Sequence, residues 1–450
     1  MHSLKMLSIC LLIIVTFLFF ICVHGTDLKH FRVESVSERS YEKKKTWVVL
    51  VAGSNGWYNY RHQSDICHAY HVVQNHGILE ENIITMMYDD IAHNKKNPYP
   101  GKIFNVPNGR NVYEGVKIDY SGIHVTPENF LAVLSGNETA VKGGSGKVVK
   151  STRDDHIFVY FTDHGAVGLV SFPNSVLTVK NLNDALKRMH KLKKFARLVF
   201  YMEACESGSM FAKVLPKNID VYAVTASNSH ESSWGCFCDN EMKLPCLGDC
   251  FSVNWIINSE TVDLNHETLT SQFQIVKQET NMSHVMHYGD LKIAKDYVAY
   301  YLGDKITNVK NIDNNLTEIK SKTSVSWPSR EIYLRMLEKE LYEAETELQR
   351  SALQHKIEKL AMISKYFETF MKSLIWMIVP NQSQYYFIIH SAPSAIESLN
   401  CFDDVIKAFH QLCFHFSHNP YVLKYTHYFS RHQMIHIIAR INCFVFKLKF

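Results

Sequence analysis

The chain has 450 residues, 46% hydrophobic and 20% charged, so it can bury large cores and divide into roughly two to four domains. Its 19 Gly and 11 Pro are few, which excludes the collagen-like and wholly disordered classes. A formal net charge of +4 is too small to indicate a nucleic acid or an anionic membrane as the main partner, while the 24 His would add positive charge in a mildly acidic compartment.

Residues 1–25 have the pattern of a secretory signal peptide. Lys5 precedes an apolar run from Leu7 to Val23, and small residues follow where a signal peptidase cuts. The run is 17 residues long, so a membrane anchor is the alternative, but no later segment reaches 18 unbroken apolar residues. We expect a cleaved signal, no stable membrane span and a secretory route. Four candidate glycosylation sites fit that route: Asn137, Asn281, Asn315 and Asn381.

Five short apolar runs alternate with helix-like stretches between residues 26 and 303. The runs are continuous, which is typical of strands that are covered on both faces. We therefore expect an α/β domain with a mostly parallel sheet, in which ligands bind at the carboxyl ends of the strands. The runs are Trp47–Ser54, Ile83–Asp90, Ile157–Gly165, Leu198–Cys205 and Val221–Ser227.

All 19 glycines lie at or before Gly303, and this change in composition marks a domain boundary. Residues 304–328 are expected to form an exposed linker, because the stretch is mostly polar and rich in Asn. Residues 329–450 are expected to be helical, with Ser329 as a helix cap. A helix packed on its own domain fits better than a coiled coil, because the heptad drifts after Leu348. The apolar stripe comprises Leu334, Leu337, Leu341, Ala344, Leu348, Ile357, Leu360, Ile363 and Phe367.

Two of the expected strands end in residues suited to nucleophilic catalysis. His164 follows one run, and Cys205 follows the next, 41 residues later. A thiolate is a nucleophile, and a histidine can take its proton and later protonate a leaving amine, so neighbouring strand ends would hold the pair face to face. Gly165 lets a substrate carbonyl approach the backbone, and the amides of Gly165 and Cys205 are candidates for an oxyanion hole. The alternative is a structural histidine and a buried core thiol.

Five stretches in this order resemble the legumain family of asparaginyl endopeptidases, which are caspase-like cysteine proteases. The likeness covers about residues 46 to 290. It implies a three-layer α/β/α domain and an enzyme that cleaves after Asn and, less readily, after Asp. Such an enzyme is made as a zymogen. It is active in a lysosomal, vacuolar or otherwise acidic compartment, or it is secreted. Protein and peptide substrates are the implied partners, and no cofactor or metal is implied. The stretches are VAGSNGWYNYRHQSDICHAY (51–70), MMYDD (86–90), YFTDHGAVG (160–168), YMEACESGSMF (201–211) and LGDCFSVNW (247–255).

The resemblance assigns roles to individual residues. His164 and Cys205 match the catalytic dyad, and Asn59 matches the residue that orients the histidine. The residues that match the specificity pocket are Arg61, His62, Glu203 and Asp249, with Ser232 and Ser233 nearby.

The chemistry of such a pocket can be argued separately. An Asn side chain offers an acceptor and a donor, so its pocket needs a donor such as Arg61 beside an acceptor such as Asp249 or Glu203. A protonated Asp presents the same pattern, so tolerance of Asp is expected only at low pH. The alternative is that Arg61 and Asp249 form a buried ion pair that only fixes register.

Four of the eleven cysteines cluster in one loop, at Cys236, Cys238, Cys246 and Cys250. A zinc site is one interpretation, although zinc usually takes CxxC pairs. Similar legumains carry a loop disulfide at the positions of Cys238 and Cys246. Cys236 and Cys250 have no counterpart there, and they either pair with each other or remain free.

The C-terminal part resembles, more weakly, the helical legumain prodomain that covers the active site as an intramolecular inhibitor. Cys401 and Cys413 keep its twelve-residue spacing, whereas only Cys443 remains of the second pair. We expect acid-triggered self-cleavage after an Asn or Asp between Lys305 and Ser326, where Asn308, Asn311, Asn314 and Asn315 lie in a polar stretch. If the histidine-rich tail (401–450) docks over the pocket carboxylates, acid would weaken that contact.

Two other functions share part of this pattern. A glycolipid-anchor transamidase has a related Cys–His site, but it is expected to carry a membrane span after the protease domain, and none is visible. An inactive protease-like binding module is opposed by the intact His164 and Cys205.

Overall fold

The structure is a computed structural model that describes residues 44–305, 325–379, 381–391, 395–412, 415–416 and 420–430. The expected signal peptide, the four linker asparagines, Cys413 and Cys443 lie outside these residues. No helix in the described ranges is long and apolar enough to cross a membrane.

A six-stranded sheet organises the first part of the chain, with the strand order β11-β8-β7-β3-β1-β2. Neighbouring strands run parallel except β11, which pairs antiparallel with β8 at one edge. The five parallel strands coincide with the five apolar runs of the sequence. Their bounds are β1 Thr46–Ala52, β2 Ile83–Met86, β3 His156–Thr162, β7 Arg197–Glu203 and β8 Val221–Thr225; β11 is Met286–Gly289.

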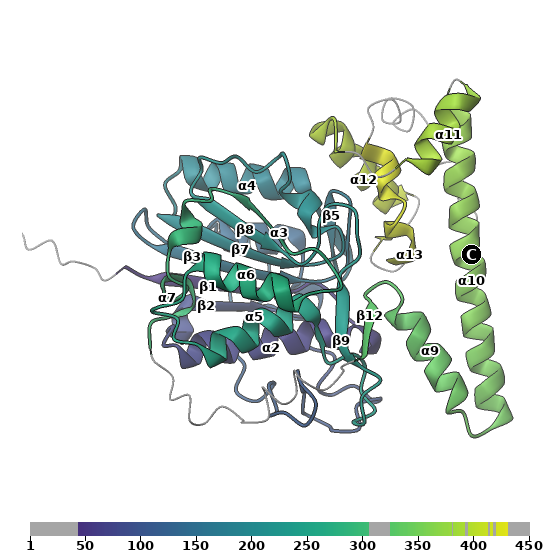
Figure 1. The fold of residues 1–450 in the computed structure, drawn as a ribbon, viewed down its shortest axis with the longest axis horizontal. Coiled ribbons are helices and arrows are strands. Elements are labelled where there is room, and N and C mark those ends of the chain that lie inside the picture. The colour runs from purple at the N-terminus through teal and green to yellow at the C-terminus, as the bar shows by residue number, and fades with distance from the viewer. Residues whose placement is uncertain are drawn as a thin grey trace, which may run out of the picture. The chain divides into compact units, whose positions relative to one another are not determined.

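Alternate residues of each central strand enter two different cores, which explains why the runs are continuously apolar. Val49 and Val51 of β1 lie in the core beneath α3 and α4, whereas Val48 and Leu50 lie in the core beneath α2, α5 and α6. Figure 1 shows these helices on opposite faces of the sheet. This is the expected three-layer α/β/α arrangement. The helices are α2 Tyr60–Asn75, α3 Pro127–Leu134, α4 Val179–Lys191, α5 Cys250–Thr261 and α6 Leu269–Glu279.

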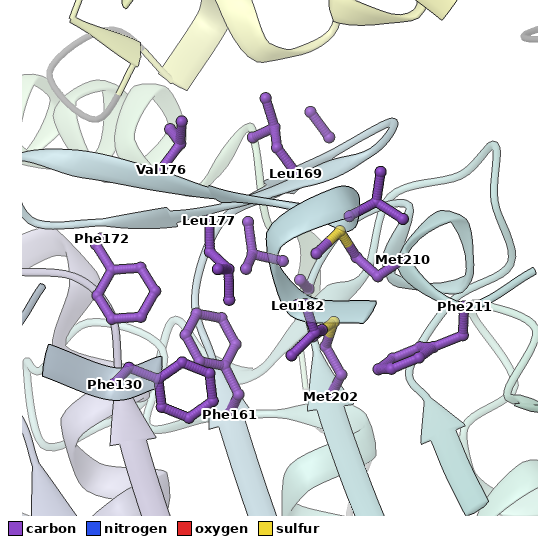
Figure 2. Close-up of a cluster of buried hydrophobic side chains, with 14 of the residues drawn as sticks. Phe130, Phe161, Leu169, Phe172, Val176, Leu177, Leu182, Met202, Met210 and Phe211 are labelled. Carbon is purple, nitrogen blue, oxygen red and sulfur yellow. The ribbon is translucent and has the colours of Figure 1, made fainter. Parts of the chain in front are cut away.

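The first of these cores is rich in aromatic side chains (Figure 2). Phe130 from α3, Phe161 from β3 and Phe172 from β5 pack with ring centroids 5.4 to 6.3 Å apart. Fully burying one such side chain contributes roughly 1.5–3 kcal/mol. The sheet is thus held rigidly below the strand ends that matter for chemistry.

A small sheet follows β3, made of β4 Gly165–Ala166, β5 Leu169–Phe172 and β6 Ser175–Thr178.

A second small sheet joins a hairpin of the first part to a later segment. β9 (Trp234–Cys238) pairs antiparallel with β10 (Gly248–Asp249) on one side and with β12 (Val325–Pro328) on the other. The end of the expected linker is therefore a paired strand rather than an exposed chain. Its Trp327 and Pro328 gain partners only in the folded protein, so local sequence could not reveal the strand.

The rest of the described chain is helical, as the sequence predicts. Its helices are α9 Ile332–Tyr342, α10 Glu347–Ile378, α11 Gln382–His390, α12 Leu399–Leu412 and α13 Pro420–Leu423. Two expectations are wrong in detail. The stripe from Leu334 to Phe367 is broken, because Thr346 and Gln349 form a capping box that starts a new helix, and Leu348 is 83% exposed. Ser329 does not cap α9, because its side chain and amide are bonded to Ser233 instead.

The described part of the tail contacts β6 and α4. Asp403 of α12 accepts a hydrogen bond from Thr178 Oγ1 at 2.5 Å, and Phe402 is fully buried. His410 contacts the carbonyl of Asn174 at 3.1 Å. The expectation that the tail docks over the pocket carboxylates is not met by these residues, because another segment lies there.

Candidate active site

Two neighbouring parallel strands bring the expected catalytic residues to one edge of the sheet. β3 ends at Thr162 and β7 ends at Glu203, and these two residues are partners in the strand register. His164 follows β3 by two residues, and Cys205 follows β7 by two. Since parallel strands end on the same side of a sheet, both side chains lie at the same edge.

The imidazole of His164 is held from one side only. Its Nε2 lies 2.8 Å from Asn59 Oδ1, and the Asn59 amide nitrogen donates to the carbonyl of Asn55 at 2.9 Å. Because that oxygen only accepts, Nε2 carries the hydrogen and Nδ1 keeps its lone pair. Nδ1 is buried and has no hydrogen-bond partner among the described residues, which leaves it able to accept a proton. Burial, then the Arg61 charge, then that of Arg330, lower the pKa of His164 to about 3.

Cys205 is 1% exposed and forms no disulfide with another cysteine in the described part of the chain. Its Sγ lies 3.2 Å from Ser232 Oγ and 3.8 Å from Ser233 Oγ. Burial raises the pKa of the thiol above its ordinary value, although the Arg330 charge opposes this shift. In this arrangement the thiol is therefore protonated at neutral pH. By contrast, Cys67 is a core thiol in α2, whose Sγ contacts Met87 Sδ at 3.8 Å.

Gly165 packs directly against the backbone of the cysteine. A Cβ atom at this position would lie 2.3 Å from the Cys205 carbonyl oxygen and 2.8 Å from Ala204 Cβ. Only glycine fits at these distances, so the two backbones that were expected to bind an oxyanion are side by side.

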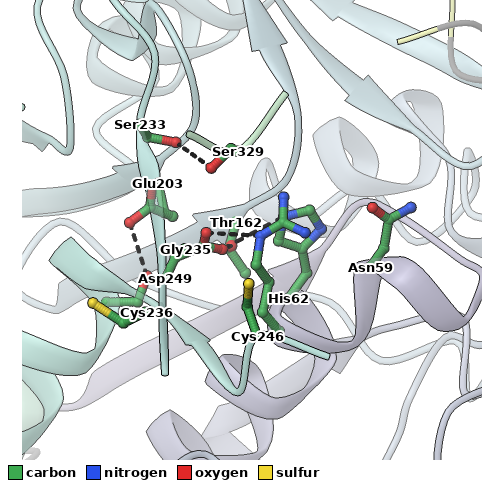
Figure 3. A network of polar contacts seen from close by, with 12 residues as sticks. Asn59, His62, Thr162, Glu203, Ser233, Gly235, Cys236, Cys246, Asp249 and Ser329 are labelled. Atoms are coloured by element: carbon green, nitrogen blue, oxygen red, sulfur yellow. Dashed lines mark hydrogen bonds and ion pairs between the residues drawn. The ribbon is translucent and has the colours of Figure 1, made fainter. Parts of the chain in front are cut away.

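The polar pocket is built around Asp249, the last residue of β10 (Figure 3). Arg61 Nε donates to Asp249 Oδ1 at 2.8 Å, and His62 Nε2 lies 3.4 Å from Asp249 Oδ2. Both come from the first turn of α2, directly after Asn59. Glu203, at the end of β7, accepts from Ser252 Oγ at 3.2 Å. All of the charged residues in this group are about 1% exposed.

Three polar atoms of this buried group lack partners among the described residues. They are Arg61 Nη2, a donor, and two acceptors, Glu203 Oε1 and Asp163 Oδ2, the latter on a carboxylate 3.5 Å from His62 Nδ1. A buried polar atom without a partner costs roughly 1–3 kcal/mol, so such atoms require a partner, which can be a water molecule, an ion or a ligand. Arg61 and Glu203 thus offer one donor and one acceptor within a buried cluster of charged side chains.

Carboxyl groups outnumber the cations in this pocket. Burial, followed by the neighbouring Asp249 charge, raises the pKa of both Glu203 and Asp65. Burial also raises the pKa of Asp249, while Arg61 opposes the shift. At least part of this cluster therefore holds protons at a higher pH than free carboxyl groups do.

Sequence reasoning missed Asp65. Its Oδ2 accepts from the amide of Asp249 at 3.2 Å, and its Oδ1 accepts from Asn105 Nδ2 at 2.7 Å. The spacing of four residues from Arg61 places Asp65 on the same face of α2, and this was the signal that could have found it.

Arg330 and Glu206 were also missed, and they form an ion pair beside the dyad. Arg330 Nη1 donates to Glu206 Oε1 at 2.8 Å, and Nη2 bonds the other carboxylate oxygen and the carbonyl of Gly165, the latter at 3.0 Å. Glu206 follows the cysteine directly and has a left-handed backbone, with φ of 47°. The two residues are 124 positions apart, so no local pattern could connect them.

The four loop cysteines form two disulfides, Cys236–Cys250 and Cys238–Cys246. Their sulfurs are therefore unavailable as zinc ligands, and the metal interpretation of this loop is wrong.

Of the candidate glycosylation residues, Asn137, Asn281 and Asn381 are exposed, and Asn381 also caps α11. Asn315 lies outside the described residues.

A buried cysteine and an oriented histidine at adjacent strand ends, on a mostly parallel sheet with helices on both faces, define a cysteine peptidase of the caspase-like class. The chain belongs to the peptidase C13 family, whose model matches residues 46–304. It is a cysteine-type endopeptidase, and its expected resemblance to the legumains is confirmed. The transamidase and inactive-module alternatives are not favoured.

Similar proteins are found in several animals. Bovine legumain is 44% identical over 84% of this chain and 85% of its own length, and a hemoglobinase of Schistosoma mansoni is 41% identical over 86% and 87%. Rat legumain is 57% identical over 58% of this chain, and the matched region spans 60% of the rat protein.

Proposed function

We propose that the protein hydrolyses peptide bonds on the carboxyl side of asparagine, with Cys205 as nucleophile and His164 as general base and acid. The observation that carries the proposal is the unpartnered pair in the pocket, Arg61 Nη2 and Glu203 Oε1. An Asn side chain brings one carbonyl acceptor for the guanidinium and one amide donor for the carboxylate. It would satisfy both atoms at once.

The chemistry follows from the geometry of the dyad. Nδ1 of His164 takes the thiol proton as Sγ of Cys205 bonds to the scissile carbonyl carbon. The same proton then passes to the leaving amine, which leaves a thioester that water hydrolyses with the imidazole again as base. Asn59 keeps the ring in the required tautomer, and the amides of Gly165 and Cys205 are proposed to bind the oxyanion.

Asp is proposed to be accepted only in acid. A protonated Asp side chain presents a carbonyl and a hydroxyl, which repeat the acceptor and donor of Asn. An ionised Asp would instead bring another negative charge beside Asp249 and Glu203, whose crowding already raises the pKa of Glu203.

The protein is further proposed to be made as a zymogen, with its C-terminal domain as intramolecular inhibitor. The contacts of residues 325–330 support this. β12 lies on the free edge of β9, Ser329 is 4% exposed beside Ser233, and Arg330 bonds Glu206 next to the nucleophile. A substrate cannot occupy the same edge until this segment leaves.

The proposed division of the chain is a signal at 1–25, a catalytic domain at 26–303, a linker at 304–328 whose last residues dock as β12, and a prodomain at 329–450. A secretory route to an acidic lysosome-like or vacuole-like compartment, or out of the cell, fits the signal-like start. A vacuolar-processing enzyme of Arabidopsis thaliana is 48% identical over 61% of this chain.

The test is to incubate the acid-activated protein with a random peptide pool at mildly acid pH and to sequence the new ends. New carboxyl termini should be Asn in large excess, with Asp second. Termini dominated by any other residue would overturn the proposed specificity.

A further inference from the structure

The hairpin of β9 and β10 is closed by two nested disulfides that lie in different places. Cys238–Cys246 lies toward the turn, whereas Cys236–Cys250 lies at the base, where Gly235 pairs with Asp249. Cys250 directly follows the pocket residue Asp249 and begins α5. Both disulfides border the strand edge that β12 covers, since Cys238 pairs with Val325, but Cys236–Cys250 is the one that also adjoins the pocket residue Asp249.

β12 lies on that edge in the way a peptide substrate would. It runs antiparallel to β9, with Trp327 opposite Gly235 and Pro328 opposite Trp234. The Ser329 amide donates to the carbonyl of Ser233 at 2.9 Å, and a hydrogen bond from the Ser329 side chain opposes the rise that burial causes in the pKa of Asp249. Ser329 therefore stands where the residue before the scissile bond, P1, places its side chain. Peptides that add a strand to a sheet edge bind in this manner.

Counting back from Ser329 places Pro328 at P2, Trp327 at P3 and Ser326 at P4. Ser326 Oγ lies 3.7 Å from Cys236 Sγ and 3.7 Å from Cys250 Sγ. The register shifts between Val325 and Trp327, so Ser326 lies at an irregular step of the ladder, against the two sulfurs. The disulfide forms the surface that meets the fourth residue of the bound strand.

We propose that the Cys236–Cys250 disulfide is a specificity-determining wall of the P4 subsite. The proposal rests on the proposed peptidase function, because P4 has a meaning only when Ser329 marks P1. Two sulfurs in contact with a side chain the size of serine leave space for a small residue and exclude a large ring. The wall acts on binding, since it touches no reacting atom.

Two acetylated fluorogenic peptides test this proposal on the acid-activated protein: Ser-Trp-Pro-Asn and Trp-Pro-Asn, each followed by the reporter amine. For the wild-type protein the fourth residue should raise kcat/KM about fivefold, through KM. The double variant Cys236→Ala/Cys250→Ala should lose this gain. The matched control Cys238→Ala/Cys246→Ala, which removes the disulfide toward the turn, should keep it.

The outcomes are separable. The P4 proposal would be overturned if the fourth residue raised kcat/KM equally in the wild type and in the Cys236→Ala/Cys250→Ala variant, or if it did not raise kcat/KM in the wild type. Cleavage of both peptides would still support the proposed peptidase function. If the wild type cleaves neither peptide after Asn, the proposed function itself fails. If the Cys236→Ala/Cys250→Ala variant does not fold, the proposal is tested by kcat/KM of the wild-type protein on peptides with Gly, Ser or Trp at P4. The value for Trp should be several-fold lower than the value for Ser. Equal values would contradict the proposed wall.

Discussion

At the scale of single residues, the site depends on which polar atoms have partners. The carboxyl ends of the apolar runs were visible in the sequence, and so was the order of His164 and Cys205. The contact between Arg61 and Asp249 was also considered there, but the atoms of Arg61 and Glu203 that remain without partners were not visible, because α2, β7, β10 and α5 meet only in the folded chain. A sequence shows which side chains are present but does not show which of their atoms lack a hydrogen bond.

Replacing Cys205 by Ala should abolish hydrolysis, because the bond-forming atom is removed. The matched control is Cys67→Ala, which removes another buried thiol of the same domain. That core substitution should leave most of kcat/KM, at a stability cost of about 1 kcal/mol. Rates and thermal melting of both variants provide the measurement. Equal losses of activity in the two variants would mean that the nucleophile is wrongly assigned.

Replacing Arg61 by Ala should cost about 2–5 kcal/mol of transition-state stabilisation on Asn substrates, because the substrate oxygen and the facing carboxyl groups lose their donor. Arg110→Ala serves as control, since Arg110 also pairs with a carboxylate, Glu260, but has a half-exposed side chain on another surface. Comparison of kcat/KM for both variants measures the difference. A loss under threefold for Arg61→Ala would remove this residue from the pocket.

At the scale of elements, strands buried on both faces were the predictable part. β1, β2, β3, β7 and β8 are recognisable from composition because each lies between two cores. β11 and β12 are not, because their half-exposed residues carry no clear pattern and each depends on pairing with a distant strand. The break between α9 and α10 shows the same limit: the apolar spacing continued, but the local capping box at Thr346 set the boundary.

Arg330→Ala should release β12 from the dyad. The variant loses the bidentate bond to Glu206 and the bond to Gly165, so the full-length precursor should react with an Asn-directed covalent inhibitor at neutral pH at least about tenfold faster than the wild type. Arg335→Ala is the control in the helix that follows, α9, because its exposed ion pair is with the N-cap residue Glu331. Equal labelling of both variants would show that Arg330 does not hold the segment in place.

At the scale of the whole molecule, the proposed zymogen predicts that closure of the site depends on pH through His164. Burial, then the charges of Arg61 and Arg330, lower the pKa of His164 to about 3. Departure of the segment that carries Arg330 would remove part of this shift, so the open form would have the higher pKa. The closed form should then lose stability as the pH falls through the pKa of the open form, by at most about 1.4 kcal/mol per pH unit, and acid is expected to favour opening.

The full-length precursor held at pH 4.5 should fragment after an Asn or Asp between Lys305 and Ser326, and at pH 7 it should stay intact. Fragment masses over time provide the measurement, and a Cys205→Ala precursor should stay whole at both pH values. Cleavage of that variant, or an intact wild-type precursor at pH 4.5, would show that the linker is not a self-cleavage site.

The central claim is that a buried guanidinium and a buried carboxyl group select an asparagine side chain. The most direct measurement is kcat/KM of the activated protein on three peptides that differ only at P1, with Asn, Asp or Gln, at pH 6.5 and pH 4.5. Asn should be cleaved best at both pH values, Asp should gain on Asn by tenfold or more at the lower pH, and Gln should stay poor. Asp cleaved as well as Asn at pH 6.5, or a ratio that does not change with pH, would contradict the account.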